Sequence, residues 1–379
     1  MDLLFTKGVK GKTDDQFNIS LYSESNFKNT NLKFDVTGLS KIKKEYGVQL
    51  IGVKSELNKD IRFTVFNNDN IIDVEGSFYE LDNKFVALMD NIEDTILGDE
   101  YFDCIYNMPF FIITEGLEAE LFMSRDEFSK CISKLPSQLN NTMLSKVLYT
   151  NELIAMVKDI QNYTFTIYHN LIKAGEELSK IPESAFRQYN INPKESVYEY
   201  RVRSSQSNVI SSLYMSIIIQ LSSILDLISK LTCEIINMPK DYDKLIKFKS
   251  GSIYFSNIGR FSDILKKYNG FKGSIINNRK DYDNLILNRN LIVHNGFLSS
   301  NSYIFLGKGT DIVNKKEISY AQIYIWDNDD TNKPARYKNR TKFYSQKNSI
   351  DEYVLNYILK FYFEIGKTLD MLNDYIKTR

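Results

Sequence analysis

The chain has 379 residues, which is enough for two domains and a large core, and its 43% hydrophobic and 25% charged residues are typical of a globular protein. The net charge is zero, but residues 1–150 hold 16 Lys and Arg against 24 Asp and Glu, whereas residues 151–379 hold 32 against 24. The basic second part favours either contact with a polyanion or attraction between the two parts. Three scattered cysteines without a CxxC pair exclude a disulfide-rich scaffold and a cysteine zinc site, and they indicate a reducing, cytoplasmic compartment.

Residues 1–145 have the pattern of a mixed α/β domain. Short β-branched and aromatic runs, separated by turn-like Asn and Asp, predict a meander of strands. The predicted strands are residues 61–67, 71–79, 84–90 and 108–114. Ser124 and Glu127 form a capping box, which predicts a short helix that ends before Pro136.

From about residue 143 the apolar residues recur every three or four positions, which predicts amphipathic helices. The predicted helices are residues 143–182, 205–237, 252–268, a segment that ends in 288–296, and 349–377. Residues 299–348 contain strand-like runs. The expected fold class is therefore α+β, with a mixed α/β domain at 1–145 and a helical domain at 146–379 that carries a β-rich insertion at about 299–348.

Several functional classes lack their signatures. The beginning of the chain lacks the basic-then-apolar order of a secretory signal, and the most apolar stretch, 213–228, contains Gln220 and Asp226. It falls short of the roughly 18 clean apolar residues of a membrane span, so we expect no membrane partner. No P-loop, dinucleotide-binding or metalloprotease motif occurs, and two histidines are too few for a histidine metal site. We expect no cofactor.

One short segment, "NRNLIVHNG" at 288–296, carries a possible chemistry. His294 is one of only two histidines and follows Arg289 by five positions. Gly296 is suited to end a helix, which would place His294 in a last helical turn, where positive charge is favoured. Imidazole there is suited to acid–base chemistry, although a surface histidine beside an unrelated arginine would give the same pattern.

The pattern R-N-x-x-x-H, formed here by Arg289, Asn290 and His294, resembles the ribonuclease motif of the HEPN superfamily. That motif is an Arg and a His separated by four to six residues, often with a polar residue directly after the Arg. The resemblance covers about residues 146–379 and implies a helical bundle that acts as a homodimer, in which two Arg–His sets share one cleft. Many members are metal-independent endoribonucleases of phage defence or toxin–antitoxin systems. The 50-residue insertion departs from the minimal bundle.

These residue types fit RNA cleavage through the 2′-hydroxyl. Imidazole can remove or donate the proton, and guanidinium can hold the phosphoryl oxygens. Asn290 could bind the phosphate or orient His294. Asp226 is a weaker candidate, since family members often have a polar residue on an early helix near the site. The sequence predicts catalysis by Arg289, Asn290 and His294, without a metal.

Residues 333–347 form a basic stretch with interleaved aromatic residues, a pattern typical of an RNA-binding surface or of a solvated edge strand. The predicted RNA-binding residues are Lys333, Arg336, Lys338, Arg340 and Lys342 of this stretch, together with Asp226. Two other functions stay open. One is a non-catalytic HEPN-like module that binds RNA, a nucleotide or a partner protein. The other is a metal-dependent nuclease that uses the acidic run 90–103.

A free ribonuclease would harm its own cell. We therefore expect control by the domain at 1–145, acting as a regulator or sensor, or by an antitoxin or a phage-derived trigger.

Overall fold

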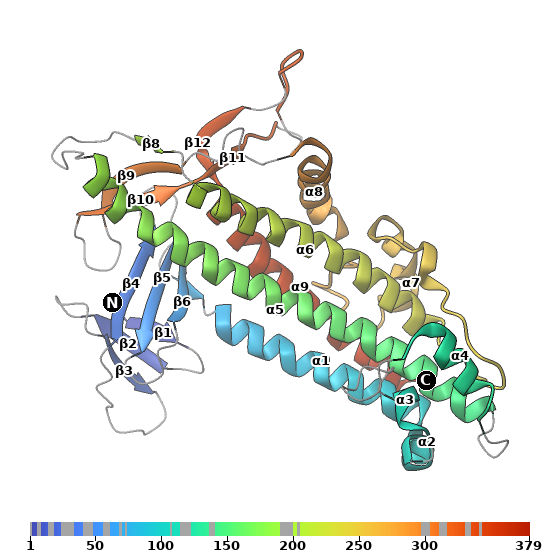
Figure 1. The fold of residues 1–379 in the computed structure, drawn as a ribbon. Helices are drawn as coiled ribbons and strands as arrows, with labels where there is room; N and C mark the ends of the chain where they lie inside the picture. Colours follow the sequence, from blue (N-terminus) through green and yellow to red (C-terminus); the bar gives the residue numbers. More distant parts are fainter. Residues whose placement is uncertain are drawn as a thin grey trace. The chain divides into compact units, whose positions relative to one another are not determined.

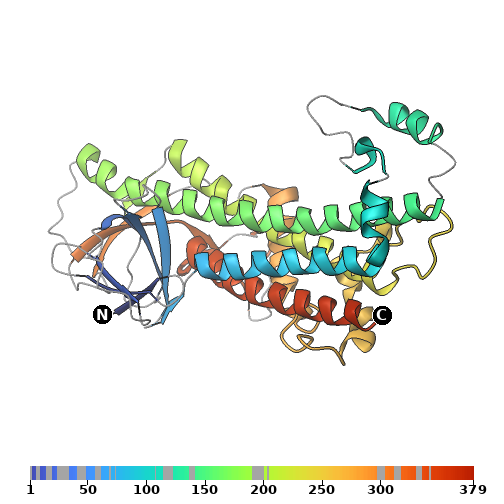
Figure 2. The same cartoon turned by 90° about the horizontal axis from the view of Figure 1, so that it is seen from below.

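The computed structural model describes much of the chain as helices and strands. The described residues are 2–5, 9–13, 19–23, 34–40, 48–55, 61–67, 70–72, 74–106, 108–113, 123–135, 141–189, 200–202, 205–296, 304–310, 317–329, 335–340 and 343–379. Helix predominates in them. The long helices are α1 (Val74–Ile96), α5 (Asn141–Tyr189), α6 (Ser205–Ile236) and α9 (Ile350–Lys377) (Figures 1 and 2).

The shorter elements lie between these helices. The short helices and 3₁₀ turns are η1 (Gly98–Glu100), α2 (Tyr101–Tyr106), α3 (Phe110–Ile113), α4 (Arg125–Ile132), η2 (Ser250–Ser252), η3 (Phe255–Phe261), α7 (Ser262–Leu265), η4 (Arg279–Tyr282) and α8 (Asp283–Asn295). The N-terminal strands are β1 (Asp2–Phe5), β2 (Val9–Thr13), β3 (Ile19–Ser23), β4 (Phe34–Ser40), β5 (Val48–Ser55), β6 (Ile61–Asn67) and β7 (Asn70–Ile72). The later strands are β8 (Tyr200–Val202), β9 (Ile304–Thr310), β10 (Glu317–Gln322), β11 (Tyr324–Trp326) and β12 (Tyr344–Ser349).

All described strand pairs are antiparallel. The orders are β1-β2-β3, β4-β5-β6-β7, β10-β9-β8 and β11-β12. The first two sheets are meanders of neighbouring strands, and β6 coincides with the strand predicted at 61–67.

The chain divides into two compact units, each built from separate stretches of sequence. The first unit is Met1–Glu80, Thr164–Ser222 and Lys280–Phe363, and the second is Leu81–Tyr163, Ser223–Arg279 and Glu364–Arg379. The four long helices each run from one unit into the other. A domain boundary at residue 145 would fall inside α5.

In the second unit, α1 packs against α9 and α5. Buried apolar residues follow α1 at helical spacing, including Leu81, Phe85, Leu88 and Ile92. Lys84 pairs with Asp370 of α9 at 2.7 Å, and Gln161 of α5 donates to Asp82 at 2.6 Å. A second hydrogen bond joins Asn91 of α1 to Asn373 of α9. Residue numbers increase in the same direction along both helices from one contact to the next, so α1 and α9 are parallel there.

Two of the predicted strands are wrong because they lie in α1. Residues 84–90 are helical throughout, and 71–79 turns from β7 into α1 at Val74. The third error is 108–114, which contains the short helix α3. A short apolar run fits both the 3.6-residue period of a helix and the two-residue period of a strand. Only packing against neighbouring helices decides between the two structures.

The helical predictions fare better. The capping box of Ser124 and Glu127 is confirmed at the start of α4, and α6 matches the prediction at 205–237. α5 passes Pro182 and ends at Tyr189, so the predicted helix end near Pro182 is wrong. The predicted helix at 252–268 is wrong, because this segment breaks into η2, η3 and α7.

Among the described helices, α6 alone is long and apolar enough to cross a membrane. Its most apolar window is 56% buried within the fold, and the core helix of a bundle has the same length and composition. In the second unit Tyr149 of α5 donates to the buried carboxylate of Glu234 on α6 at 3.2 Å. α6 is thus a core helix by its contacts.

Candidate functional site

Helix α8 carries the Arg289–His294 motif and is held in place by a buried asparagine. Asn288 is fully buried, although it lies in the middle of the helix. Its side-chain oxygen accepts a hydrogen bond from Trp326 Nε1 of β11 at 3.0 Å, and its Nδ2 donates to the Tyr353 hydroxyl of α9 at 2.6 Å. Burial raises the pKa of Tyr353 well above its usual value, so this hydroxyl stays neutral. A satisfied buried amide of this kind fixes both the position and the rotation of α8.

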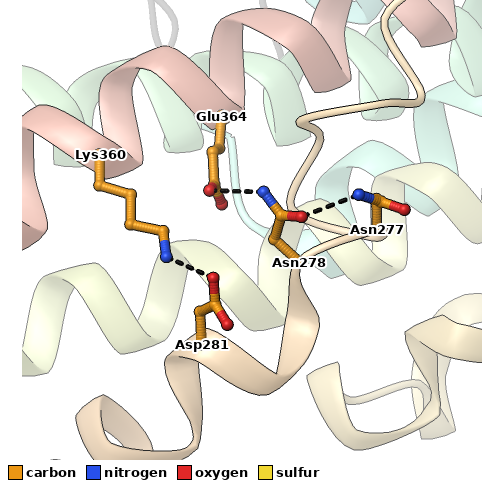
Figure 3. A network of polar contacts seen from close by, with 5 residues as sticks. All are labelled: Asn277, Asn278, Asp281, Lys360 and Glu364. Atoms are coloured by element: carbon orange, nitrogen blue, oxygen red, sulfur yellow. Dashed lines mark hydrogen bonds and ion pairs between the residues drawn. The ribbon is translucent and has the colours of Figure 1, made fainter.

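A second contact holds the beginning of α8 on α9. Asp281 of η4 forms an ion pair with Lys360 (Figure 3). The ring of Tyr282 packs edge-on against Phe361, with centroids 5.5 Å apart. Asp281 of η4 thus meets Lys360 of α9, and Asn288 of α8 meets Tyr353 of α9. The segment η4–α8 therefore runs antiparallel to the first part of α9.

In the second unit, a separate polar contact holds the chain just before η4. Asn278 Nδ2 donates to the buried carboxylate of Glu364 at 2.7 Å, and Asn277 donates to Asn278 at 2.8 Å (Figure 3). These bonds fix the residues that lead into the motif helix.

The anchored rotation of α8 decides where the motif residues point. Leu285, Asn288 and Ile292 form its buried side. At about 100° per residue, Asn290 and His294 lie about 40° apart on the opposite side. Arg289 lies between the two sides and is half-buried, whereas His294 is exposed.

Asn290 acts on Arg289. Arg289 Nη1 donates to Asn290 Oδ1 at 2.9 Å, which draws the guanidinium toward the side that His294 shares. The sequence suggested that Asn290 binds phosphate or orients His294, but within the described residues no bond joins Asn290 to His294. Asn290 is therefore a positioning residue for Arg289.

Arg289 and His294 do not touch within one copy of the chain. Five helical residues place them about 140° apart around α8 and about 7.5 Å apart along it. The helix ends directly after the motif, where Gly296 has φ 84° and donates its N–H to Ile292 O at 3.1 Å. His294 and the half-exposed Val293 thus stand at an open helix end.

Asp226 has a structural role. Its Oδ1 accepts the backbone N–H of Phe255 at 2.8 Å, which fixes the start of η3 in the second unit. This half-buried carboxylate, predicted to bind RNA, therefore has a backbone partner in the structure.

Part of the predicted RNA-binding stretch is described. Arg336, Lys338 and Arg340 are exposed, whereas Lys333 and Lys342 lie outside the described residues. The second histidine, His169, is exposed on α5, with its ring against Phe165 at 4.2 Å.

The acidic run 90–103 lies mainly on α1 and η1. Desolvation, followed by repulsion from Asp90 and Asp94, raises the pKa of Glu93, and Glu100 pairs with Lys146 at 2.7 Å. Within the described residues no group of three His, Cys, Asp or Glu side chains could hold a metal ion. The contacts of these acids favour a structural role.

Sequence reasoning did not identify Asn288, Trp326 and Tyr353 as parts of the site. One signal was present: Trp326 is the only tryptophan of the chain and lies in the region 299–348 that contains strand-like runs. Its partner could not be read from the sequence because 38 residues separate it from Asn288.

The fold and the site define a mainly helical protein that presents an Arg–Asn–His surface on one anchored helix. No family model, no curated protein and no solved structure matches the chain. The resemblance to the HEPN superfamily therefore rests on residues 289–294 and on the order of helices.

Proposed function

We propose that the protein is a metal-independent endoribonuclease of the antiviral or toxin type that acts in the cytoplasm as a homodimer. The observation that carries the proposal is the arrangement on α8, where Asn290 accepts a hydrogen bond from the Arg289 guanidinium and His294 is exposed in the last helical turn. The fold would be HEPN-like, with the strands of 304–349 inserted before the last helix.

The homodimer is part of the proposal because one copy separates Arg289 from His294. An isologous twofold contact around α8 would bring the guanidinium of one copy near the imidazole of its partner. The half-exposed Val293 beside His294 would gain burial in such a contact.

The chemistry needs no cofactor. A base removes the proton of the 2′-hydroxyl, and the oxygen attacks the adjacent phosphorus. The P–O bond to the 5′-oxygen breaks, and an acid protonates the leaving oxygen. His294 performs proton transfer, and Arg289 stabilises the charge that builds on the phosphoryl oxygens. The products are a 2′,3′-cyclic phosphate and a 5′-hydroxyl.

The test is cleavage of labelled RNA by the purified protein in EDTA, with DNA of the same sequence as control. We expect RNA to be cut and DNA to stay intact, because DNA lacks the 2′-hydroxyl. His294→Ala and Arg289→Ala should each abolish cleavage, whereas His169→Ala, at the other exposed histidine, should not change it. Activity that survives both motif substitutions would refute the proposal.

A second candidate function is a binding module without catalysis, for RNA, a nucleotide or a protein. The observation that favours it is the separation of Arg289 and His294 within one copy. It predicts RNA binding without any product and no effect of His294→Ala on the growth of an expressing host.

Control by the N-terminal part is a further element of the proposal. Because α1 contributes buried residues from Phe78 onward, a truncation that tests this control should stop before Val74. If removal of residues 1–72 leaves cleavage and toxicity unchanged, the regulatory role falls.

A further inference from the structure

The exposed turn 335–340 is a defined hairpin. Tyr337 and Arg340 exchange both backbone hydrogen bonds, at 3.0 and 2.9 Å. Between them Lys338 has φ 52°, a left-handed conformation that costs a lysine free energy and that is usually taken by Gly or Asn. The ring of Tyr337 is 65% exposed, and the Lys338 ammonium lies 5.5 Å from its centroid. The sequence therefore holds an aromatic ring and a cation together at the tip.

The hairpin is anchored to the motif helix. Ala335 donates to Asp327 O at 2.8 Å, and Asp327 donates to Phe343 O at 2.7 Å, which closes the base. The residue before Asp327 is Trp326, which is buried and bonded to Asn288, the neighbour of Arg289. All of these residues belong to the first unit, so the hairpin grows from the strand that fixes α8.

The charge of the tip has one sign. Arg336, Lys338 and Arg340 are exposed, and residues 331–347 contain no acidic residue. The guanidinium of Arg340 also lies 4.7 Å from the centroid of the Phe343 ring. The three exposed cations and the 65% exposed Tyr337 stand together on one short hairpin. They match a phosphodiester backbone with free bases, where cations neutralise phosphates and a base stacks on the ring.

We propose that the hairpin 335–340 binds the unpaired strand of an RNA beside the α8 site, with Tyr337 stacking on one base. Paired bases in an A-form duplex are stacked on one another and present no free face to the ring, so the hairpin selects single strands. The idea that the hairpin selects the RNA to be cut rests on the proposed function. The binding of single-stranded RNA by the hairpin does not.

The experiment uses the full chain with His294→Ala, so that RNA is not consumed. Fluorescence anisotropy measures the dissociation constants for a labelled single-stranded RNA, for single-stranded DNA of the same sequence and for the RNA duplex. Tyr337→Ala should weaken binding of both single strands roughly ten- to hundredfold. Replacing Arg336, Lys338 and Arg340 by Gln should reduce the slope of log K against log salt by about 2.

Matched controls come from elsewhere on the surface. Tyr106→Ala removes a tyrosine that is 90% exposed, and Lys244, Lys247 and Lys249 changed together to Gln remove three exposed charges. Both controls should bind like the parent. Equal losses in the controls, unchanged binding by Tyr337→Ala, or duplex bound as tightly as single strands would each overturn the proposal.

The two proposals fail separately. If wild-type protein cuts no RNA but hairpin variants lose single-strand binding, the ribonuclease proposal falls and the binding site stands. If RNA is cut and the hairpin variants bind normally, only the binding site falls.

Discussion

At the scale of single residues, the hydrogen bond between Arg289 and Asn290 positions the guanidinium of Arg289. The guanidinium keeps further donors for a phosphate, because the bond to Asn290 uses only one of its N–H groups. Asn290→Ala would leave the side chain of Arg289 free to rotate away from His294.

We expect Asn290→Ala to lower the single-turnover cleavage rate roughly ten- to hundredfold, since a hydrogen bond to a charged group contributes about 1.5–3 kcal/mol. Asn290→Asp should also lower the rate, because a carboxylate would neutralise the charge that the phosphate needs. Rates equal to those of the wild type in both variants would show that Asn290 positions nothing.

Glu93 gives a pH-dependent prediction at the same scale. Burial and the neighbouring carboxylates raise its pKa in the folded protein, so the folded state binds more protons than the unfolded state above the ordinary glutamate pKa. Stability is therefore lost as pH rises through this window. Glu93→Gln should raise the thermal midpoint at pH 7 and change it little at pH 4. A rise of the same size at both pH values would contradict this origin.

At the scale of elements, hydrogen bonds of a buried polar side chain hold α8 in place. Its buried side carries an asparagine, so its rotation is specified by directional hydrogen bonds from β11 and α9. Apolar packing alone fixes rotation less sharply, because many side-chain arrangements can fill the same volume.

Tyr353→Phe should destabilise the protein by about 1–3 kcal/mol, because it leaves Asn288 with an unsatisfied buried donor. Trp326→Phe removes the other partner and should cost at least as much. The double variant should lose less than the sum, since both groups bond to one amide. Chemical denaturation measures all three values, and strict additivity would show that Asn288 does not couple them.

At the scale of the whole molecule, the proposed homodimer predicts that each site takes residues from two copies. Arg289→Ala protein and His294→Ala protein are each expected to be inactive. Mixed in equal amounts, they should recover about a quarter of the wild-type activity, because half of the dimers are mixed and one of their two sites is intact. Cleavage assays of the mixture across a concentration series check this. No recovery despite subunit exchange, measured with labelled protein, would mean that the sites are not shared.

Local chemistry made parts of this protein predictable from its sequence. The capping box of α4, the extent of α6 and the glycine end of α8 depend on residues within a few positions of one another, so each was correct. The positions of Arg289, Asn290 and His294 on one helix followed from the same short segment.

Only the tertiary structure decided the rest. Residues 84–90 fit a strand as well as a helix until packing against α9 made them α1. Asp226 became the partner of a backbone N–H 29 residues away, and the rotation of α8 depends on Trp326 and Tyr353, which lie 38 and 65 residues from Asn288. Periodicity and capping are local properties of a chain, whereas a buried hydrogen bond exists only after distant segments have met.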